Sequence, residues 1–205
     1  MGLAELAALR SSFVLLPSPP VGASWSLPTV AGRIVEVSGA RGAPLLTIAM
    51  ALVKEGQAVE QPVAWVGTRE SCFYPPDAAA AGVDVEALVV VRAKESRQIP
   101  RAAGELLRSG AFALIVIDLG LADLSLAAQT RLNGLAQKHG TALVCLTKKS
   151  AAAPSLGSLV SLRAHAERKP ARSGAFTCEI AVVKDKRGRP GWTHAEEHAG
   201  PEGLR

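Results

Sequence analysis

Five short runs that are apolar throughout, separated by segments with helical spacing, constrain the fold of this chain more than any other feature. The apolar runs lie at residues 33–37, 62–67, 87–93, 113–119 and 141–147. The helix-like segments lie between them, at 44–55, 76–82, 97–109 and 125–139. Strands that are apolar on both faces and alternate with helices are typical of a mostly parallel sheet covered on both sides. We therefore predict an α/β domain of this kind.

Glycines stand at the expected ends of the helices. A glycine just past the last turn can adopt the left-handed backbone conformation that closes many helices. Four glycines are expected to act in this way: Gly56, Gly82, Gly110 and Gly140.

The pattern changes after residue 147. Residues 158–168 and 175–186 alternate apolar and polar side chains, and the stretch "KPARSG" joins them. This arrangement predicts an antiparallel hairpin with basic ends at one edge of the sheet.

The length of 205 residues suits one domain with a substantial core. Residues 1–31 read as a short N-terminal helix, with an apolar stripe of Leu3, Leu6, Ala7 and Leu9, followed by a proline-rich linker. Residues 32–190 form the predicted core domain, and residues 191–205 form a polar tail that we expect to be disordered.

Composition indicates a cytoplasmic protein with no membrane partner. No apolar run reaches the roughly 18–20 residues that span a bilayer. Cys72, Cys145 and Cys178 are odd in number and far apart, and two of them lie inside apolar runs. This pattern favours buried thiols in a reducing compartment over disulfides or a zinc site.

Residues 33–52, "RIVEVSGARGAPLLTIAMAL", follow the strand, glycine turn and helix order of a nucleotide phosphate loop. A working loop needs G-x-x-x-x-G-K-[ST], in which backbone amides and the Lys hold the phosphates and the hydroxyl holds magnesium. Counted from Gly39, those last three positions are Pro44, Leu45 and Leu46. The degenerate loop comprises Gly39, Arg41, Gly42, Pro44, Leu45 and Leu46. We expect no productive ATP binding, and hence no cofactor.

The apolar run at 113–119 carries Asp118 near its end, where related ATPases present a magnesium ligand. Without the Lys and the hydroxyl, this Asp has no metal–phosphate pair to organise. We therefore predict a capping or salt-bridging role for Asp118, and treat it as a vestigial second nucleotide motif.

Positive charge is concentrated in the last third of the chain. Between residues 148 and 189 there are ten Lys or Arg residues and three acids, although the whole chain carries a net charge of only +5. If the hairpin forms, its ends and the "TKKS" loop can gather into one patch that binds DNA phosphates or an acidic protein. The candidate residues are Lys148, Lys149, Arg163, Arg168, Lys169, Arg172, Lys184, Lys186, Arg187 and Arg189. An ordinary solvated face is the alternative.

No catalytic residues or metal ligands are predicted. The stretch from His194 to His198 formally fits H-x-x-E-H, but that zinc motif needs a buried amphipathic helix, whereas this stretch lies in the polar tail. His165 lies in the alternating segment, where we expect it to face solvent.

Taken in order, the segments from about Gly32 to Lys186 resemble RecA. The resemblance rests on "GRIVEVSG", on residues 81–120, and on "LVSLRAHAER" followed by "FTCEIAVVKDKRGRP" with its Lys-x-Lys ending. It implies a RecA-like fold. It also implies that residues with which RecA binds and hydrolyses ATP are replaced in this chain. The phosphate-loop Lys and Thr of RecA are replaced by Leu45 and Leu46. The catalytic Glu falls at Glu70 or Arg69, and the switch Gln is replaced by Thr147.

Among RecA-like proteins without the ATP motifs, the chain resembles the ImuA family best. That resemblance implies a non-catalytic adaptor in SOS-induced mutagenesis by translesion DNA synthesis. It implies RecA and an ImuB-type relative of the Y-family polymerases as partners, with nucleoid association and contact with DNA as further expectations. RecA also uses a comparable N-terminal segment between protomers, so homo-oligomer formation is a further expectation. The alternatives are a residual DNA-stimulated ATPase and a SulA-like inhibitor of the division protein FtsZ.

Overall fold

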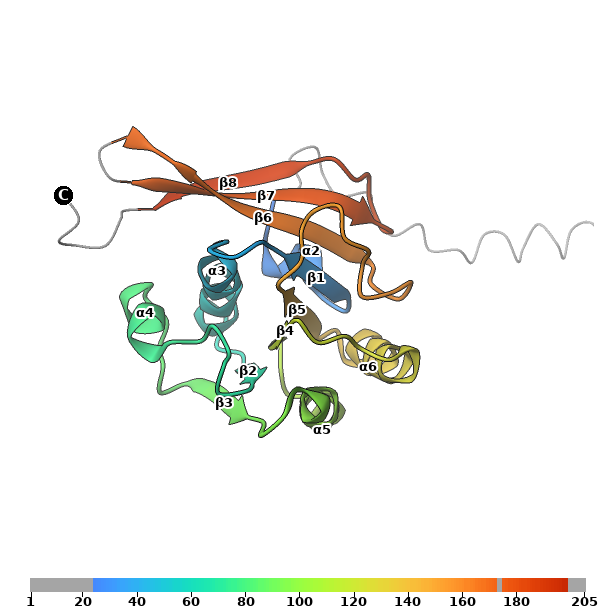
Figure 1. Cartoon of the computed structure of the whole chain (residues 1–205). Helices are drawn as coiled ribbons and strands as arrows, with labels where there is room; N and C mark the ends of the chain where they lie inside the picture. The colour runs from blue at the N-terminus through green and yellow to red at the C-terminus, as the bar shows by residue number, and fades with distance from the viewer. Residues whose placement is uncertain (1–23, 173–174, 199–205) are drawn as a thin grey trace, which may run out of the picture.

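The computed structural model describes residues 24–172 and 175–198, which build one eight-stranded sheet with helices on both faces (Figure 1). The strands are β1 (Ile34–Ser38), β2 (Val63–Gly67), β3 (Leu88–Arg92), β4 (Leu114–Gly120), β5 (Ala142–Thr147), β6 (Leu162–Pro170), β7 (Phe176–Asp185) and β8 (Thr193–His198). The helices are α2 (Leu27–Val30), α3 (Leu45–Ala58), α4 (Pro75–Ala80), the 3₁₀ turn η1 (Ser96–Gln98), α5 (Ile99–Ser109) and α6 (Leu126–His139).

The strand order is β3-β2-β4-β5-β1-β6-β7-β8. The first six strands in this order pair in parallel, and β7 and β8 pair antiparallel. Each of the five predicted apolar strands is present, and the predicted mostly parallel α/β sheet is confirmed. Because β1 lies between β5 and β6, the loop that follows β1 opens at the middle of the carboxyl edge of the sheet.

Two apolar layers cover the sheet. Helices α3 and α4 lie on one face, and α5 and α6 lie on the other (Figure 1). Along β1, Val35 and Val37 belong to the layer beneath α3, whereas Ile34 belongs to the opposite layer. This alternation follows from the two-residue period of a strand and explains why these strands are apolar throughout.

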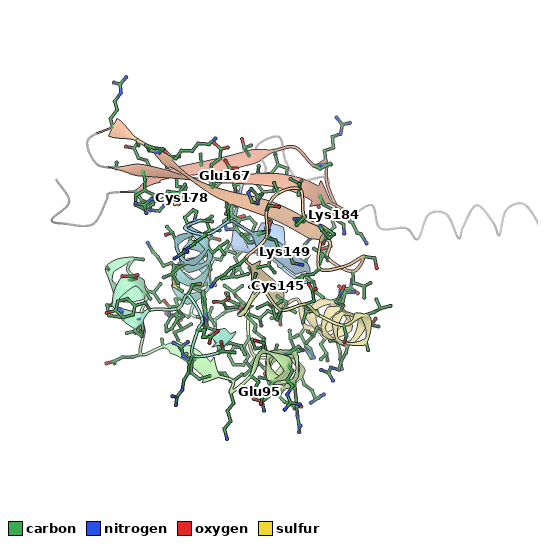
Figure 2. All side chains as sticks on the ribbon, viewed as in Figure 1. Glu95, Cys145, Lys149, Glu167, Cys178 and Lys184 are labelled. Atoms are coloured by element: carbon green, nitrogen blue, oxygen red, sulfur yellow. The ribbon has the colours of Figure 1, made fainter. Side chains whose placement is uncertain are left out.

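The three cysteines are free thiols, as predicted. Cys145 on β5 and Cys178 on β7 are buried, and Cys72 is half-buried. Figure 2 shows Cys178 on the hairpin and Cys145 within the sheet below it.

The predicted hairpin is confirmed as β6 and β7, but it does not end the sheet. β8 pairs along β7, with Thr193 opposite Ala181 and His198 opposite Phe176. Our expectation of a disordered tail was wrong for residues 193–198. A polar segment can form a strand here because one edge of β7 offers unpaired backbone groups and because an edge strand tolerates polar side chains.

Residues 24–31, which we assigned to the linker, pack on the domain. Trp25 is only 4% exposed, and its indole N–H donates to the carbonyl of Ile48 at 3.3 Å. α2 follows directly and buries Val30. The predicted N-terminal helix and most of the proline-rich stretch lie outside the described residues.

Three of the four glycines act as predicted. Gly110 and Gly140 are left-handed C-caps of α5 and α6, and Gly82 has a φ of 83° just past α4. The prediction for Gly56 was wrong, because α3 continues through it to Ala58. A Cβ at Gly56 would lie 2.5 Å from a methyl group of Val63, so a close approach to β2 requires this glycine.

A buried carboxylate joins β1 to the long loop at residues 148–161. Glu36 is 0% exposed and accepts hydrogen bonds from the hydroxyls of Thr147 (3.2 Å) and Ser155 (2.8 Å). It also accepts a hydrogen bond from the backbone N–H of Leu156 at 2.9 Å. A buried charge with these partners fixes the loop against the sheet.

We expect Glu36→Ala to destabilise the domain by about 3–5 kcal/mol, the cost of breaking a buried ion pair on one side. The Arg163 Nε lies 3.8 Å and the Lys149 Nζ lies 4.0 Å from the Glu36 carboxylate, so the substitution leaves buried positive charge without its acid. Urea denaturation measures this change. Glu197→Ala, which removes an exposed acid from β8, is the control and should stay within about 0.5 kcal/mol of wild type. An equally small change in Glu36→Ala would contradict this role.

Candidate functional site: the carboxyl-edge cavity

A cavity of about 640 Å³ opens where the degenerate phosphate loop meets the hairpin. We call it the carboxyl-edge cavity. It is lined by the loop and the first turn of α3, the segment between β2 and α4, α4 itself, the residues after β4 and β5, and the turn end of the hairpin. The lining residues outside positions 40–47 are Cys72, Asp77, Leu121, Lys148, Arg168 and Phe176. The hollow of a phosphate site is therefore retained.

The backbone of the loop no longer offers a full set of amides to a phosphate. The N–H of Gly39 donates to the carbonyl of Thr147 at 3.1 Å, and the N–H of Ala43 donates to Ala40 at 3.0 Å. The N–H of Leu45 donates to Ala43 at 2.8 Å, and Pro44 has no N–H. Four donors that could face an anion are thus either absent or bonded within the protein.

The side chains that follow are equally unsuited to a triphosphate. Leu45 is buried in the apolar layer beneath the sheet, and Leu46 packs against the same layer. Thr47, one residue further along, lies beside the Cys178 thiol. Burial raises the pKa of the Cys178 thiol, while nearby Arg168 and the Thr47 hydroxyl act in the opposite direction.

Asp118 also has its oxygens occupied by the protein. One carboxylate oxygen accepts from the hydroxyl of Ser71 at 2.9 Å and from the N–H of Cys72 at 2.6 Å. The other oxygen accepts from the N–H of Gly120 at 3.1 Å. Asp118 thus ties β4 to the segment after β2, in the manner of the capping role predicted for it.

Asp118 does not line the carboxyl-edge cavity. It lines a smaller neighbouring cavity of about 210 Å³, together with Glu70. Leu121 and Lys148 line both cavities and lie between them. Asp118 and the degenerate loop therefore line two adjoining hollows.

Cys72 is a poor nucleophile in this setting. Burial, followed by the negative charge of Asp118 and a hydrogen bond with it, raises the pKa of the Cys72 thiol well above its usual range. The thiolate, which is the reactive form, is correspondingly scarce at neutral pH.

The remaining positions implied by the resemblance lie outside the lining of the carboxyl-edge cavity. Glu70 is exposed in the smaller cavity. Thr147 is buried, and its hydroxyl donates to Glu36. It does not line the carboxyl-edge cavity. Arg69 is exposed and lines neither hollow.

The ten basic candidates do not gather into one patch. At the turn end of the hairpin, Lys148 and Arg168 line the cavity, and the Arg168 guanidinium lies 3.8 Å from the centre of the Phe176 ring. Lys169 pairs with Glu179 at 2.7 Å, and Arg172 is exposed nearby in the chain.

The other basic residues lie toward the opposite end of the hairpin, where Lys184 is labelled in Figure 2. Arg163 is buried and donates to backbone carbonyls of the 148–161 loop, and Lys149 lies beside it near Glu36. Burial lowers the pKa of Lys184. Arg187 donates to two carbonyls at residues 31–32. Lys186 and Arg189 are exposed. Several of these charges therefore hold the structure together, and only a part of the set is available to DNA.

Two histidine positions differ from their predicted surroundings. His165 is only 8% exposed, and its Nδ1 lies 3.3 Å from the hydroxyl of Ser38, so our expectation that it faces solvent was wrong. Its strand is covered on both sides at this point. His194 and His198 lie on strand β8, not on the helix that the zinc motif requires. Within residues 24–172 and 175–198, no group of three or more suitable side chains is placed to hold a metal ion.

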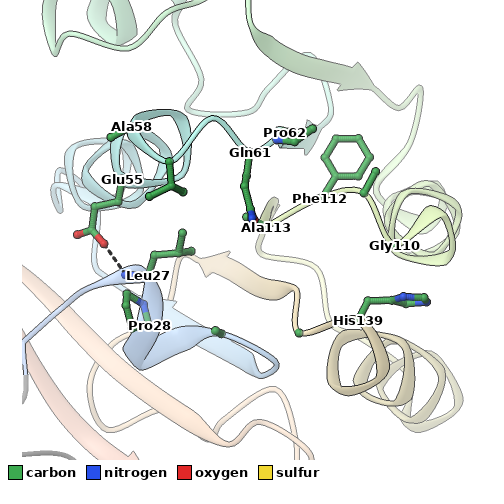
Figure 3. Close-up of a pocket in the computed structure, with 14 residues that line it drawn as sticks. Leu27, Pro28, Glu55, Ala58, Gln61, Pro62, Gly110, Phe112, Ala113 and His139 are labelled. Atoms are coloured by element: carbon green, nitrogen blue, oxygen red, sulfur yellow. Dashed lines mark hydrogen bonds between the residues drawn. The ribbon is translucent and has the colours of Figure 1, made fainter.

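Sequence reasoning missed a second hollow, at the opposite edge of the sheet. It has a volume of about 810 Å³ and is lined mostly by apolar groups from α2, the end of α3, the turn before β4 and the end of α6 (Figure 3). Leu27 and Pro28 form one wall, and the N–H of Leu27 donates to Glu55 at 2.6 Å. Its residues are scattered over the chain, so no local pattern could reveal it.

No helix of the described residues is long and apolar enough to cross a membrane.

A mostly parallel sheet with a strand–loop–helix turn after β1 at its carboxyl edge, and an acid near the end of β4 on the far side of β5, is the arrangement of the P-loop class of ATPase-like domains. Residues 24–148 match the RecA N-terminal domain family, and this match covers more than half of the chain. The chain therefore belongs to the RecA N-terminal domain family.

Individual relatives agree with this assignment. The chain is 37% identical over 87 residues to the protein RecA of Fusobacterium nucleatum, and 36% identical over 87 residues to the protein RecA of Corynebacterium jeikeium. Each match covers 42% of this chain and 23% of the relative. The chain thus matches about a quarter of the length of these relatives.

We expect Asp118→Asn to lower the free energy of unfolding by about 1–3 kcal/mol, because the amide presents a donor where the carboxylate accepts from three protein groups. Chemical denaturation measures the loss. Asp77→Asn, a change at an exposed acid lining the carboxyl-edge cavity, should leave stability unchanged. Wild-type stability in Asp118→Asn would argue that this carboxylate is not a structural tie.

Proposed function

We propose that this protein is a non-catalytic RecA-like adaptor in damage-induced mutagenesis. In this proposal it binds an ImuB-type relative of the Y-family polymerases and RecA during translesion DNA synthesis in the cytoplasm. The observation that carries the proposal is the state of the phosphate loop. The RecA fold is kept, while the residues and amides that would hold a triphosphate are replaced or bonded within the protein.

The second nucleotide motif supports the same conclusion. A magnesium ion needs carboxylate oxygens that are free to coordinate it. Asp118 instead accepts hydrogen bonds from three groups of the chain, and it lies in a different hollow from the loop. With neither a phosphate cradle nor a metal ligand, the domain is proposed to act through its surfaces.

DNA contact forms a secondary part of the proposal. Lys186 and Arg189 are exposed near the β7–β8 connection, and Arg172 is exposed at the turn between β6 and β7. Exposed cations of this kind bind phosphates without sequence preference and with a steep dependence on salt.

A residual ATPase is the second candidate, and one observation favours it. The cavity has kept a substantial volume, and Lys148 and Arg168 extend into its lining from outside the loop. Cations from these positions would have to replace the lost lysine for a triphosphate to bind.

The adaptor proposal is tested by a pull-down of the purified chain with an ImuB-type protein, RecA and FtsZ as parallel baits. We expect retention by the ImuB-type protein and by RecA, with no retention by FtsZ. Retention should be the same with ATP and magnesium as with a chelator, because no nucleotide is required.

Retention by FtsZ alone would overturn the proposal in favour of a division inhibitor. Retention by none of the baits would also overturn it. Binding that appears only with ATP and magnesium would favour the residual ATPase.

A further inference from the structure

The carboxyl-edge cavity presents cations around an apolar floor. Arg41 comes from the loop, Lys148 from the segment after β5, and Arg168 from β6, and all three are exposed. Of the lining residues that the structure describes, Asp77 is the one acid, so their charged groups sum to +2. Among the described residues, none of these three cations forms a salt bridge, which leaves them available to a ligand.

The floor and mouth of the cavity are aliphatic. Leu45 and Leu46 occupy the positions of the lost Lys and hydroxyl residue, and Leu121 stands at the mouth with 82% of its surface exposed. Leu46 and Leu121 both line the hollow, so an aliphatic side chain of a partner can bury apolar surface against them.

We propose that the carboxyl-edge cavity is a docking site for an acidic peptide segment of a partner protein that carries an aliphatic anchor residue. The anchor would pack on Leu46 at the floor and on Leu121 at the mouth, and the acids on either side of it would pair with Arg41, Lys148 and Arg168. The choice of an acidic segment rests on charge complementarity. This inference deepens the proposed adaptor function and rests on it.

Two other ligands fit the cavity less well. A phosphate chain lacks the amide cradle, because the loop amides at residues 39, 43 and 45 are bonded within the protein. Single-stranded nucleic acid is held by bases stacked on aromatic faces. Phe176 is the aromatic side chain of the lining, and the Arg168 guanidinium already covers its ring.

The proposal is tested by fluorescence anisotropy with the full chain and a labelled peptide in which glutamates flank one leucine. Two matched probes replace the leucine by serine or the glutamates by glutamines. We expect saturable binding of the acidic leucine peptide that weakens as ionic strength rises through about 0.15 M. Each matched probe should bind about tenfold more weakly or worse.

Variants of the cavity residues test whether the peptide binds there. Lys148→Glu combined with Arg168→Glu should weaken the acidic leucine peptide about tenfold or more. Lys186→Glu combined with Arg189→Glu makes the same change in net charge at the other end of the hairpin, and should leave binding unchanged. Leu121→Ser should weaken the leucine peptide but not the serine probe, which isolates the apolar contact.

The proposal is overturned if the peptide shows no saturable binding, or if both charge-reversal pairs weaken peptide binding equally. It is also overturned if magnesium tripolyphosphate or a single-stranded oligonucleotide binds more tightly at the same site. Its failure is separable from that of the adaptor function. If the ImuB-type protein or RecA binds the cavity variants as it binds wild type, the docking site is wrong and the adaptor stands. If the peptide binds but neither protein does, the adaptor is wrong and the docking site stands.

Discussion

The hydrogen bonds accepted by Asp118 hold the carboxyl edge of the sheet in the form on which its other features depend. They join β4 to the segment after β2 and thereby position Cys72 in the wall of the carboxyl-edge cavity. A carboxylate that accepts from three protein donors is stabilised by them, and it has fewer lone pairs left for a metal ion. In this domain the acid of a nucleotide motif has become a structural tie. The same change is seen in the loop, where the N–H groups of Gly39 and Leu45 donate to carbonyls of the chain.

The hollow beside the degenerate phosphate loop has a physical explanation in the topology of the sheet. The RecA-like order of strands places the ends of β1, β4, β5 and β6 around it, so the cavity follows from topology and persists when its ligands change. Leu45 and Leu46, at the Lys and hydroxyl positions of the phosphate-loop pattern, make part of its lining apolar. The cations at the rim come from segments outside the loop. A surface with an apolar centre and a charged rim is the ordinary anatomy of a protein-binding site, which is why the degenerate site and the proposed adaptor function belong together.

Much of the fold was predictable because its information is local. The five apolar runs fixed the parallel strands, and Gly110 and Gly140 fixed two helix ends. The errors arose where contacts between segments far apart in the sequence determine the local structure. β8 forms because β7 offers it a partner, and Gly56 lies inside α3 at a point where β2 leaves no room for a side chain. The replacement of the phosphate-loop Lys and hydroxyl residue by Leu45 and Leu46 could be predicted from the sequence motif alone. The separation of the ten basic residues into different parts of the surface could not be predicted, because it depends on how the 148–161 loop folds back onto Glu36.

The central claim is that the RecA fold has been kept here without a working nucleotide site. Isothermal titration calorimetry of ATP with magnesium into the purified chain tests it most directly, with a RecA protein titrated in parallel to validate the assay. We expect no saturable binding by the wild-type chain. We also expect none after Leu45→Lys with Leu46→Thr, because Pro44 and the internally bonded amides remain. Saturable binding by the wild-type chain would contradict the claim and favour a residual ATPase.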